Sequence, residues 1–479
     1  MNYAIIFHTL GIVIDFSAAF MIPPFIVALL YGEADAKYFA MCFAAYAIIG
    51  TALGKIKPVS RKFYAKEGYI IVSLSWIILS AVGAMPFYLS GYIPSYIDAL
   101  FEAVSGFTTT GASILTDVEA LSHGMLFWRS FTHWIGGMGV LVFILAVLPL
   151  AGGENMHIMR AESPGPFVGK LVPKLRKTAF YLYAIYFSMT ILQIVLLVIN
   201  KMPVFDAVCI SMGTAGTGGF GIKNDSMASY SVTINVIVTI FMLLFGVNFS
   251  FYFLILKRKF KDAFKMSEVI CYFGIFAAVA LLIAINIDTP ERGFLLSLYD
   301  SAFAVSSVMT TTGYATADFN LWPEFSRSLL VMVMFFGACA GSTGGGIKIS
   351  RIIIYVKSII KEFSTLAHPR SVKIIKFDGK PVEKTVLNSA LVFLAVYMFL
   401  FVVSVVLVSL DNFDLVTTFT AVAATFNNIG PGLGLVGPTG NFSAFSPFSK
   451  LVLIFDMLAG RLEIFPLLLL FTPSVWKKR

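Results

Sequence analysis

Four short polar turns, each containing glycine, interrupt the apolar sequence at wide intervals. The first turn reads V-S-G-F-T-T-T-G-A-S over residues 104–113, and apolar stretches lie on both sides of it. Backbone that is neither helix nor closed barrel persists at membrane depth only where protein buries it or where it lines a water-filled path. The other turns read A-G-T-G-G-F, T-T-T-G-Y-A and N-N-I-G-P-G, at residues 215–220, 310–315 and 427–432. We therefore predict a fourfold internal repeat, with Gly111, Gly218, Gly313 and Gly430 as matching positions.

The composition supports a membrane location for these turns. Of the 479 residues, 58% are hydrophobic and 13% are charged, and the mean hydropathy is +0.86. A soluble domain contains about 25% charged residues, so we expect a helical integral membrane protein in contact with lipid. The formal net charge of +9 is interpreted as a topology signal, with no nucleic-acid partner. The four cysteines are far apart and form no metal-binding or disulfide pattern.

Ten apolar stretches are each close to the roughly 20 residues that cross a bilayer. Two lead the chain, at residues 5–30 and 38–53, and Pro23-Pro24 should kink the first. The other eight flank the polar turns in pairs, at residues 69–89 and 131–150, 179–199 and 234–256, 269–287 and 329–355, and 390–410 and 451–472.

The fold class predicted from this order is an all-α integral membrane protein with ten spans. Residues 1–54 form two additional N-terminal spans. The remainder divides into four pseudo-repeats of span, pore helix, filter loop and span around one pore, at residues 55–157, 158–260, 261–362 and 363–479. Basic loops at residues 55–66, 160–177, 257–265, 348–384 and 477–479 all fall on one side of this arrangement. The positive-inside rule makes that side cytoplasmic, with both termini inside and the turns facing outward.

A short apolar segment precedes each turn, at residues 98–107, 206–213, 300–309 and 413–426. These segments are too short to cross a bilayer, and each has an aspartate at or near its start, namely Asp98, Asp206, Asp300 and Asp414. Aspartate is a good N-cap and complements the positive end of a helix. We predict re-entrant pore helices whose carbonyl ends point at the turns. The alternative is that each aspartate is an ordinary surface cap.

The turns have the residues that a dehydrated cation requires. A ring of backbone carbonyls replaces the water shell of an ion without adding charge, and glycine permits the backbone angles that turn carbonyls inward. One turn from each unit can surround a single axis. The residues expected to bind the ion are Thr109, Thr110, Gly111, Thr217, Gly218, Thr311, Thr312, Gly313, Asn428, Ile429 and Gly430.

The stretch at residues 329–355 is interrupted by a glycine-rich run. Its members are Gly341, Ser342, Thr343, Gly344, Gly345 and Gly346. Each glycine costs a helix about 1 kcal/mol relative to alanine, so we predict a break about 15–18 Å below the outer surface. The hypothesis is an intramembrane loop that blocks the pore and moves to open it; a packing kink is the alternative. The run lacks the spacing of a phosphate-binding loop.

Two further charged residues lie at membrane depth. Arg461 is about ten residues into the last stretch, where a cation is costly and usually functional. Asp456 and Glu463 could neutralise it, so a structural ion pair stays open. Glu102, inside the first short segment, is expected to be a hydrogen-bonded buried carboxyl. His133 is expected to pack near the outer interface.

These motifs resemble the Trk/Ktr/HKT superfamily of potassium transporters over essentially the whole chain. The two leading spans, G-A-C-A-G-S-T-G-G-G-I-K at residues 337–348 and M-L-A-G-R-L-E at residues 457–463 are most similar to its TrkH branch. The resemblance implies that K+ is the transported ion, bound by carbonyls of the filter residues, and that Arg461 faces the pore beneath them. It also implies a homodimer in the bacterial inner membrane, gated by cytosolic nucleotide-binding subunits of the TrkA type.

The function predicted is potassium uptake driven by the membrane potential, with no nucleotide bound by this chain itself. The alternative within the family is a sodium-permeable or cation-coupled potassium symporter, because the second and fourth turns depart from T-T-T-G. An alternating-access transporter would need inverted repeats, whereas these units run in one direction. No Ser-His-Asp arrangement or carboxylate pair indicates an enzyme.

Overall fold

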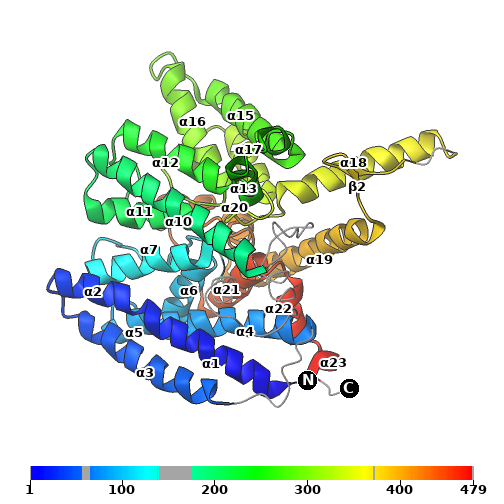
Figure 1. The fold of residues 1–479 in the computed structure, drawn as a ribbon. Coiled ribbons are helices and arrows are strands. Elements are labelled where there is room, and N and C mark those ends of the chain that lie inside the picture. Colours follow the sequence, from blue (N-terminus) through cyan, green and yellow to red (C-terminus); the bar gives the residue numbers. More distant parts are fainter. Residues whose placement is uncertain (1, 57–64, 138, 140–174, 371–372, 477–479) are drawn as a thin grey trace.

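The computed structural model describes residues 2–56, 65–137, 139, 175–370 and 373–476, and these residues are largely α-helical (Figure 1). The two strands among them, β1 (Lys376–Phe377) and β2 (Lys380–Pro381), form a small antiparallel hairpin. The leading helices are α1 (Tyr3–Phe20), α2 (Ile22–Leu30) and α3 (Ala36–Gly54). The break at Met21 agrees with the predicted kink, because the prolines that follow fit only the first turn of a new helix.

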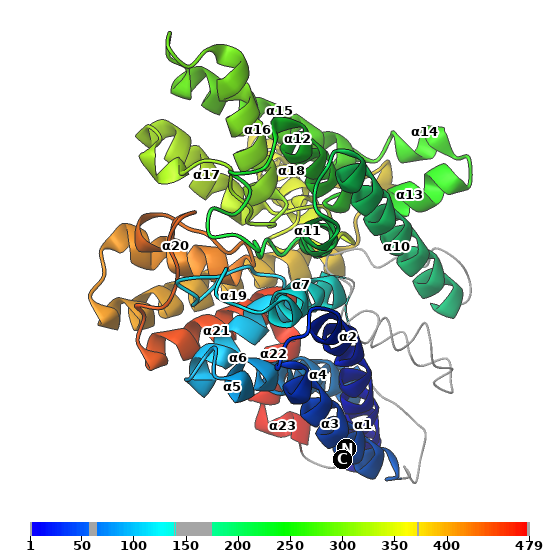
Figure 2. The same cartoon turned by 90° about the vertical axis from the view of Figure 1, so that its left-hand side faces the viewer.

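The remaining helices repeat one order: a long helix, a short helix, a turn and an outgoing helix. The first unit has α4 (Ala65–Gly83), α5 (Met85–Ser90), α6 (Tyr96–Phe107) and α7 (His123–Gly137). The second has α10 (Leu175–Ile199), α11 (Val204–Gly216), α12 (Val232–Phe245) and α13 (Phe249–Leu256), followed by α14 (Phe260–Ala263). In Figure 2 the colours pass around the molecule, so successive units lie beside one another.

The third and fourth units keep this order with more breaks. The third comprises α15 (Ser267–Ile287), α16 (Phe294–Met309), η1 (Phe319–Leu321), α17 (Glu324–Phe336) and α18 (Ile349–Ala367). The fourth comprises α19 (Lys384–Val408), η2 (Ser409–Asp411), α20 (Leu415–Phe426), η3 (Gly434–Val436), α21 (Pro447–Arg461), α22 (Phe465–Leu470) and α23 (Pro473–Trp476). Figure 1 shows α18 extending away from the helical body.

Six helices in the described ranges are long and apolar enough to cross a membrane. They are Tyr3–Leu30, Ala36–Gly54, Lys66–Ser90, Ala179–Ile199, Ser267–Ile287 and Lys384–Asp411. The pair α12 and α13 raises the number to seven if it counts as one span. The predicted stretch at residues 131–150 and the basic loop at 160–177 extend largely outside the described residues.

Two of the predicted spans contain a helix break that the sequence analysis did not anticipate. The segment at 234–256 bends by 89° between α12 and α13, where Asn248 caps the new helix by accepting from the amide of Ser250. The segment at 451–472 breaks between α21 and α22, where Glu463 and Ile464 have φ of 57° and 67°. Pro466 then starts a new helix, since proline fits the first turn.

The four short helices lie where we predicted pore helices, and one of the four predicted aspartate caps is present. Asp414 caps α20 by accepting from the amide of Thr417 at 3.0 Å. Bonds from the side chain and backbone of Thr417 hold the pKa of Asp414 below its ordinary value.

The cap prediction is wrong for the other three aspartates, because their helices begin earlier than the sequence indicated. Ser95, Pro203 and Gly293 occupy the N-cap positions of α6, α11 and α16. The displaced carboxylates instead accept from side chains: Asp98 from Lys450, Asp206 from Tyr230 and Asp300 from Arg292.

Candidate functional site

The four short helices end in the same hydrogen-bonded motif. An amide five residues after its acceptor closes each end at 2.8 Å, for Thr110 to Ser105, Gly218 to Gly213, Thr312 to Ser307 and Ile429 to Ala424. The residue before each donor has a left-handed φ between 56° and 59°; these residues are Thr109, Thr217, Thr311 and Asn428. This is the Schellman geometry, which usually employs glycine at that position. Threonine there is strained, and such strain persists only where the surroundings over-determine the conformation.

A glycine with positive φ follows two residues later in every unit. The angles are 79° at Gly111, 75° at Gly219, 91° at Gly313 and 99° at Gly430. Gly219 therefore has the conformation shared by the other three glycines, whereas the sequence analysis chose Gly218. Gly218 occupies the place that Thr110, Thr312 and Ile429 hold elsewhere. We call residues 109–111, 217–219, 311–313 and 428–430 the glycine turns.

These glycines pack against carbonyl oxygens of a neighbouring unit in closed succession. A Cβ on Gly111 would collide with the carbonyl oxygen of Gly218, and a Cβ on Gly219 with that of Thr312. A Cβ on Gly313 would meet the oxygen of Ile429, and one on Gly430 that of Thr110. The glycine turns are up to 319 residues apart in the sequence, yet they form one ring with room only for hydrogen at these positions.

The carbonyls of the ring are available as ligands. The oxygens of Thr110, Gly218, Thr312 and Ile429 accept no backbone hydrogen bond from any residue that the structure describes. Buried carbonyls almost always have a partner, so a ring of free ones calls for water or a cation. Carbonyl oxygens suit a dehydrated monovalent cation because they solvate it without adding net charge. The structure thus brings the filter residues expected from all four units together.

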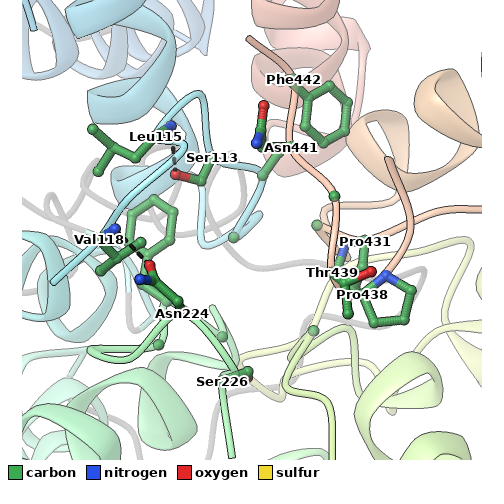
Figure 3. Close-up of a pocket in the computed structure, with 18 of the residues that line it drawn as sticks. Ser113, Leu115, Val118, Asn224, Ser226, Pro431, Pro438, Thr439, Asn441 and Phe442 are labelled. Carbon is green, nitrogen blue, oxygen red and sulfur yellow. Dashed lines mark hydrogen bonds between the residues drawn. The ribbon is translucent and has the colours of Figure 1, made fainter. Parts of the chain in front are cut away.

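A pocket of about 200 Å³ opens on one side of the ring and is lined by its four positive-φ glycines. We call it the vestibule. Figure 3 shows that segments following the glycine turns form its walls, with Ser113, Asn224, Ser226 and Thr439 contributing polar groups. The amide of Val118 in unit 1 donates to Asn224 of unit 2 at 2.8 Å, which ties two walls together.

The side chains behind the ring are buried and bonded. Glu102 accepts from the amide of Ile114 at 3.0 Å, which confirms the expected hydrogen-bonded carboxyl. Arg129 on α7 also donates to this carboxylate, from Nε at 2.7 Å, and the sequence analysis missed this partner. An arginine within an apolar helix is costly, and that cost was the signal available for finding it.

His133 does not pack near the outer interface, as expected, because it is fully buried behind the ring. Its Nε2 accepts from the amide of Phe220 at 3.3 Å, so Nδ1 carries the proton and donates to the carbonyl of Gly106 at 2.8 Å. The imidazole is therefore neutral and links α6 to the second glycine turn. A Cβ on Gly218 would collide with this ring.

The interruption predicted in the third unit forms a loop between α17 and α18. Its neck is closed by backbone bonds from Ile347 to Phe335 at 3.2 Å and from Ile349 to Ala338 at 3.1 Å. Its tip reaches the third glycine turn, where the amide of Gly345 donates to Thr311 Oγ1 at 2.7 Å. Thr311 begins the third glycine turn, and Gly313 ends it at the vestibule. The tip of the loop therefore lies on the opposite side of the ring from the vestibule.

Arg461 holds the tip of this loop against the first unit. Its guanidinium donates to the carbonyl of Thr343 at 2.8 Å and to the carbonyls of Gly136 and Gly137 at 2.5 and 2.8 Å. The two carboxylates that could have neutralised it have other partners. Glu463 pairs with Arg351, and Asp456 accepts from the hydroxyl of Ser404 at 2.6 Å. Lys348 Nζ donates to the carbonyl of Gly344 within the same loop.

Apolar helices around a ring of free carbonyls define a class, a multi-pass α-helical membrane transport protein. The family model TrkH, described as "Cation transport protein", matches residues 36–285 and 296–478. The chain belongs to this TrkH family.

Several named proteins are similar to this chain over all or nearly all of their lengths. The chain is 36% identical to the Trk system potassium uptake protein TrkH of Salmonella typhimurium and 35% identical to that of Escherichia coli K12, with 100% of each chain covered. It is 33% identical to the TrkG protein of Escherichia coli K12, covering 99% of this chain and 98% of TrkG. The crystal structure of the potassium transporter TrkH from Vibrio parahaemolyticus matches with a TM-score of 0.89 at 32% identity, covering 100% of both chains.

Proposed function

We propose that this chain takes up potassium across the bacterial cytoplasmic membrane through one pseudo-fourfold pore. The ring of glycine turns carries this proposal, because it joins four units in succession through carbonyls that accept no backbone hydrogen bond from the described residues. Relatives named as potassium uptake proteins support potassium as the ion. An inside-negative potential favours entry by about 2.3 kcal/mol per charge per 100 mV.

The proposed selectivity filter consists of the residues predicted from the sequence, with Gly219 added. Thr109, Thr217, Thr311 and Asn428 begin its four segments, and Gly111, Gly219, Gly313 and Gly430 end them at the vestibule. Backbone carbonyls between these positions replace the hydration shell of K+. None of the four segments contains a charged side chain. The ion is therefore bound weakly enough to leave the filter again.

The architecture proposed remains ten spans in four repeats with the boundaries given above. The broken pairs α12–α13, α17–α18 and α21–α22 each count as one crossing in this arrangement. The tenth span is the one predicted from the sequence at residues 131–150, which lies largely outside the described residues. Both termini then lie in the cytoplasm and the vestibule faces outward. The placement of basic residues on α18 and the β1–β2 hairpin supports this orientation.

We propose residues 341–346 and Arg461 as the gate. The loop tip touches the third filter segment, and Arg461 places a cation beside it on the inner side of the ring. A positive charge in a narrow path repels a permeating cation, so the closed loop adds an electrostatic barrier to a steric one.

Arg461→Ala should therefore raise potassium leak through the closed protein, measured as efflux from loaded liposomes. Arg327→Ala is the matched control, since Arg327 pairs with Glu324 on the surface of α17. If potassium leak in Arg461→Ala equals that of the wild type, Arg461 is not an electrostatic barrier. Deleting Gly344 to Gly346 should also raise leak if the loop blocks the path.

The proposed partners are a second copy of this chain and a cytosolic nucleotide-binding subunit of the TrkA type. The relatives are named as members of a Trk system, which supports association with other Trk components. Basic residues on α18 and beyond offer a cytoplasmic docking surface, although topology alone also places basic residues there. This chain is not proposed to bind a nucleotide.

The second candidate is a sodium-permeable or cation-coupled transporter. It is favoured by the second and fourth filter segments, T-G-G and N-I-G, which differ from T-T-G in the other two units. Expression in a strain without potassium uptake systems tests the two. Growth restored at low external potassium, with little sodium entry, supports the first proposal; absence of rescue with sodium influx supports the second.

A further inference from the structure

A buried ion pair lies behind the ring at the junction of units 1 and 2. Arg129 Nε is 2.7 Å from Glu102 Oε1, and both side chains are at most 3% exposed. Dehydrating two charges is costly, and their attraction offsets that cost only if the remaining polar atoms are also bonded. The other bonds of the pair therefore indicate what it holds in place.

Those bonds go to the short irregular segments that follow the first and second glycine turns, at residues 112–114 and 220–221. We call these two segments the exit strands, although they are not β-strands. Glu102 accepts from the amide of Ile114 at 3.0 Å and from the hydroxyl of Ser113 at 3.0 and 3.1 Å. Arg129 donates to the carbonyl of Gly221 at 2.9 Å and to Ser113 Oγ at 3.2 Å. Ser113 comes two residues after Gly111, and Gly221 comes two residues after Gly219. One guanidinium thus joins equivalent points of the two exit strands.

The same face of α7 adds a second attachment to the unit 2 segment. The guanidinium lies 3.8 Å from the centre of the Phe220 ring, and His133, one turn further along α7, accepts from the Phe220 amide. The segment held in this way contains Gly218 and Gly219 in succession. Two adjacent glycines give it the freest backbone of the four, so it needs external support most.

The other junctions are built differently among the described residues. Lys450 pairs with Asp98 at 2.6 Å between units 4 and 1, at the start of α6 and away from the exit strands. Between units 2 and 3 Asn235 donates to Tyr299, and between units 3 and 4 Asn320 bonds Gly434. The Arg351–Glu463 pair also joins units 3 and 4, but Arg351 bonds the carbonyl of Ile347 beside the glycine-rich loop and not an exit strand. The Glu102–Arg129 pair is therefore a feature of one junction, and Asp98–Lys450 offers a matched ion pair for comparison.

We propose that Glu102 and Arg129 are positioning residues that set the preference for potassium over sodium by fixing the spacing of filter segments 1 and 2. This inference rests on the proposed function. Gly111 packs directly against the carbonyl oxygen of Gly218, so a shift of either exit strand changes the distance between carbonyls of the two segments. Discrimination between the two ions depends on the size of the carbonyl cage or on the number and field of its oxygens, and both depend on that distance.

Arg129→Lys tests the proposal most directly. Lysine keeps the charge beside Glu102, but a single ammonium cannot reproduce the planar fork that reaches Glu102, Ser113 and Gly221 together. Potassium and sodium fluxes are measured in vesicles from cells that express each variant. The potassium-to-sodium flux ratio should fall about tenfold, the factor produced by about 1.4 kcal/mol. Asp98→Asn/Lys450→Gln should keep the wild-type ratio.

Two further variants keep the proposal testable if Arg129→Lys fails to fold. Glu102→Gln/Arg129→Gln removes both charges without leaving one unpaired, and Ser113→Ala removes only the hydroxyl that both partners contact. Each should lower the flux ratio in protein that still reaches the membrane. An unchanged flux ratio in all three variants, with wild-type potassium flux present, overturns the positioning role of Glu102 and Arg129 and leaves the proposed function intact. A wild-type chain that carries no potassium overturns both the proposed function and this positioning role.

Discussion

At the scale of single residues, the ring depends on positions where a hydrogen atom is all that fits. Gly219 has φ of 75°, and a Cβ there would collide with the carbonyl oxygen of Thr312. The left-handed conformation costs other residues about 1 to 2 kcal/mol, before any displacement of that carbonyl is counted. The strained threonines two residues before these glycines show that tertiary contacts, and not local preference, hold the backbone here.

Gly219→Ser should therefore impair potassium uptake at least as much as Gly111→Ser does. A cost of about 1.4 kcal/mol in the conducting geometry corresponds to about tenfold, measured as uptake rate at low external potassium. Gly274→Ser is the control, because a Cβ at Gly274 meets nothing within 4 Å. Normal uptake in Gly219→Ser would show that the second filter segment has a different register.

At the scale of secondary-structure elements, one carboxylate fastens both ends of the glycine-rich loop that we propose as the gate. Glu268, in the first turn of α15, accepts from the amide of Ala340 at 2.6 Å and from the amide of Ser350 at 3.1 Å. With the backbone bonds of the neck, this leaves residues 341–346 as the part that can move without breaking the closure. The loop is then a hinged tip on a fixed base.

Glu268→Ala should loosen this base and raise potassium leak. It removes the acceptor from two buried amides, each costing about 1–3 kcal/mol when unpaired. Glu268→Gln keeps an acceptor oxygen in the same place and should leak far less. Leak is measured as efflux from loaded liposomes, beside thermal unfolding to confirm that both variants fold. Equal leak in the two variants would show that the neck does not depend on this acceptor.

At the scale of the whole molecule, the vestibule and α18 should lie on opposite sides of the membrane. Ser443 is exposed beside the vestibule wall, and Glu362 is exposed on α18. Cys42, Cys209 and Cys339 are buried, so replacing Cys271 leaves a background in which a new thiol can be followed.

In that background, Ser443→Cys should react with a membrane-impermeant thiol reagent in intact cells. Glu362→Cys should react only in inside-out vesicles, because the positive-inside rule predicts that basic α18 lies in the cytoplasm. Labelling is read as a mass shift of the chain. The reverse pattern would invert the orientation and direct the vestibule inward.

Local sequence patterns determined much of this protein. Long apolar stretches, short apolar segments followed by glycine turns, and the glycine run at residues 341–346 are visible in the sequence because each is a property of neighbouring residues. The same holds for Arg461, whose depth follows from its distance along an apolar stretch. These features were sufficient to predict four pore-helix segments, the turns that meet in the ring, and the interrupted helix.

The tertiary structure alone decided which atoms meet. Four features involve contacts between residues 27 to 93 positions apart: the register of Gly219, the Glu102–Arg129 pair, the inward position of His133 and the attachment of Glu268. A sequence window does not contain such partners. The helix breaks near Asn248 and Ile464 also depend on packing, because an apolar run looks the same whether it bends or continues. The ring therefore follows from sequence as a set of four turns, and its geometry follows from how the units pack.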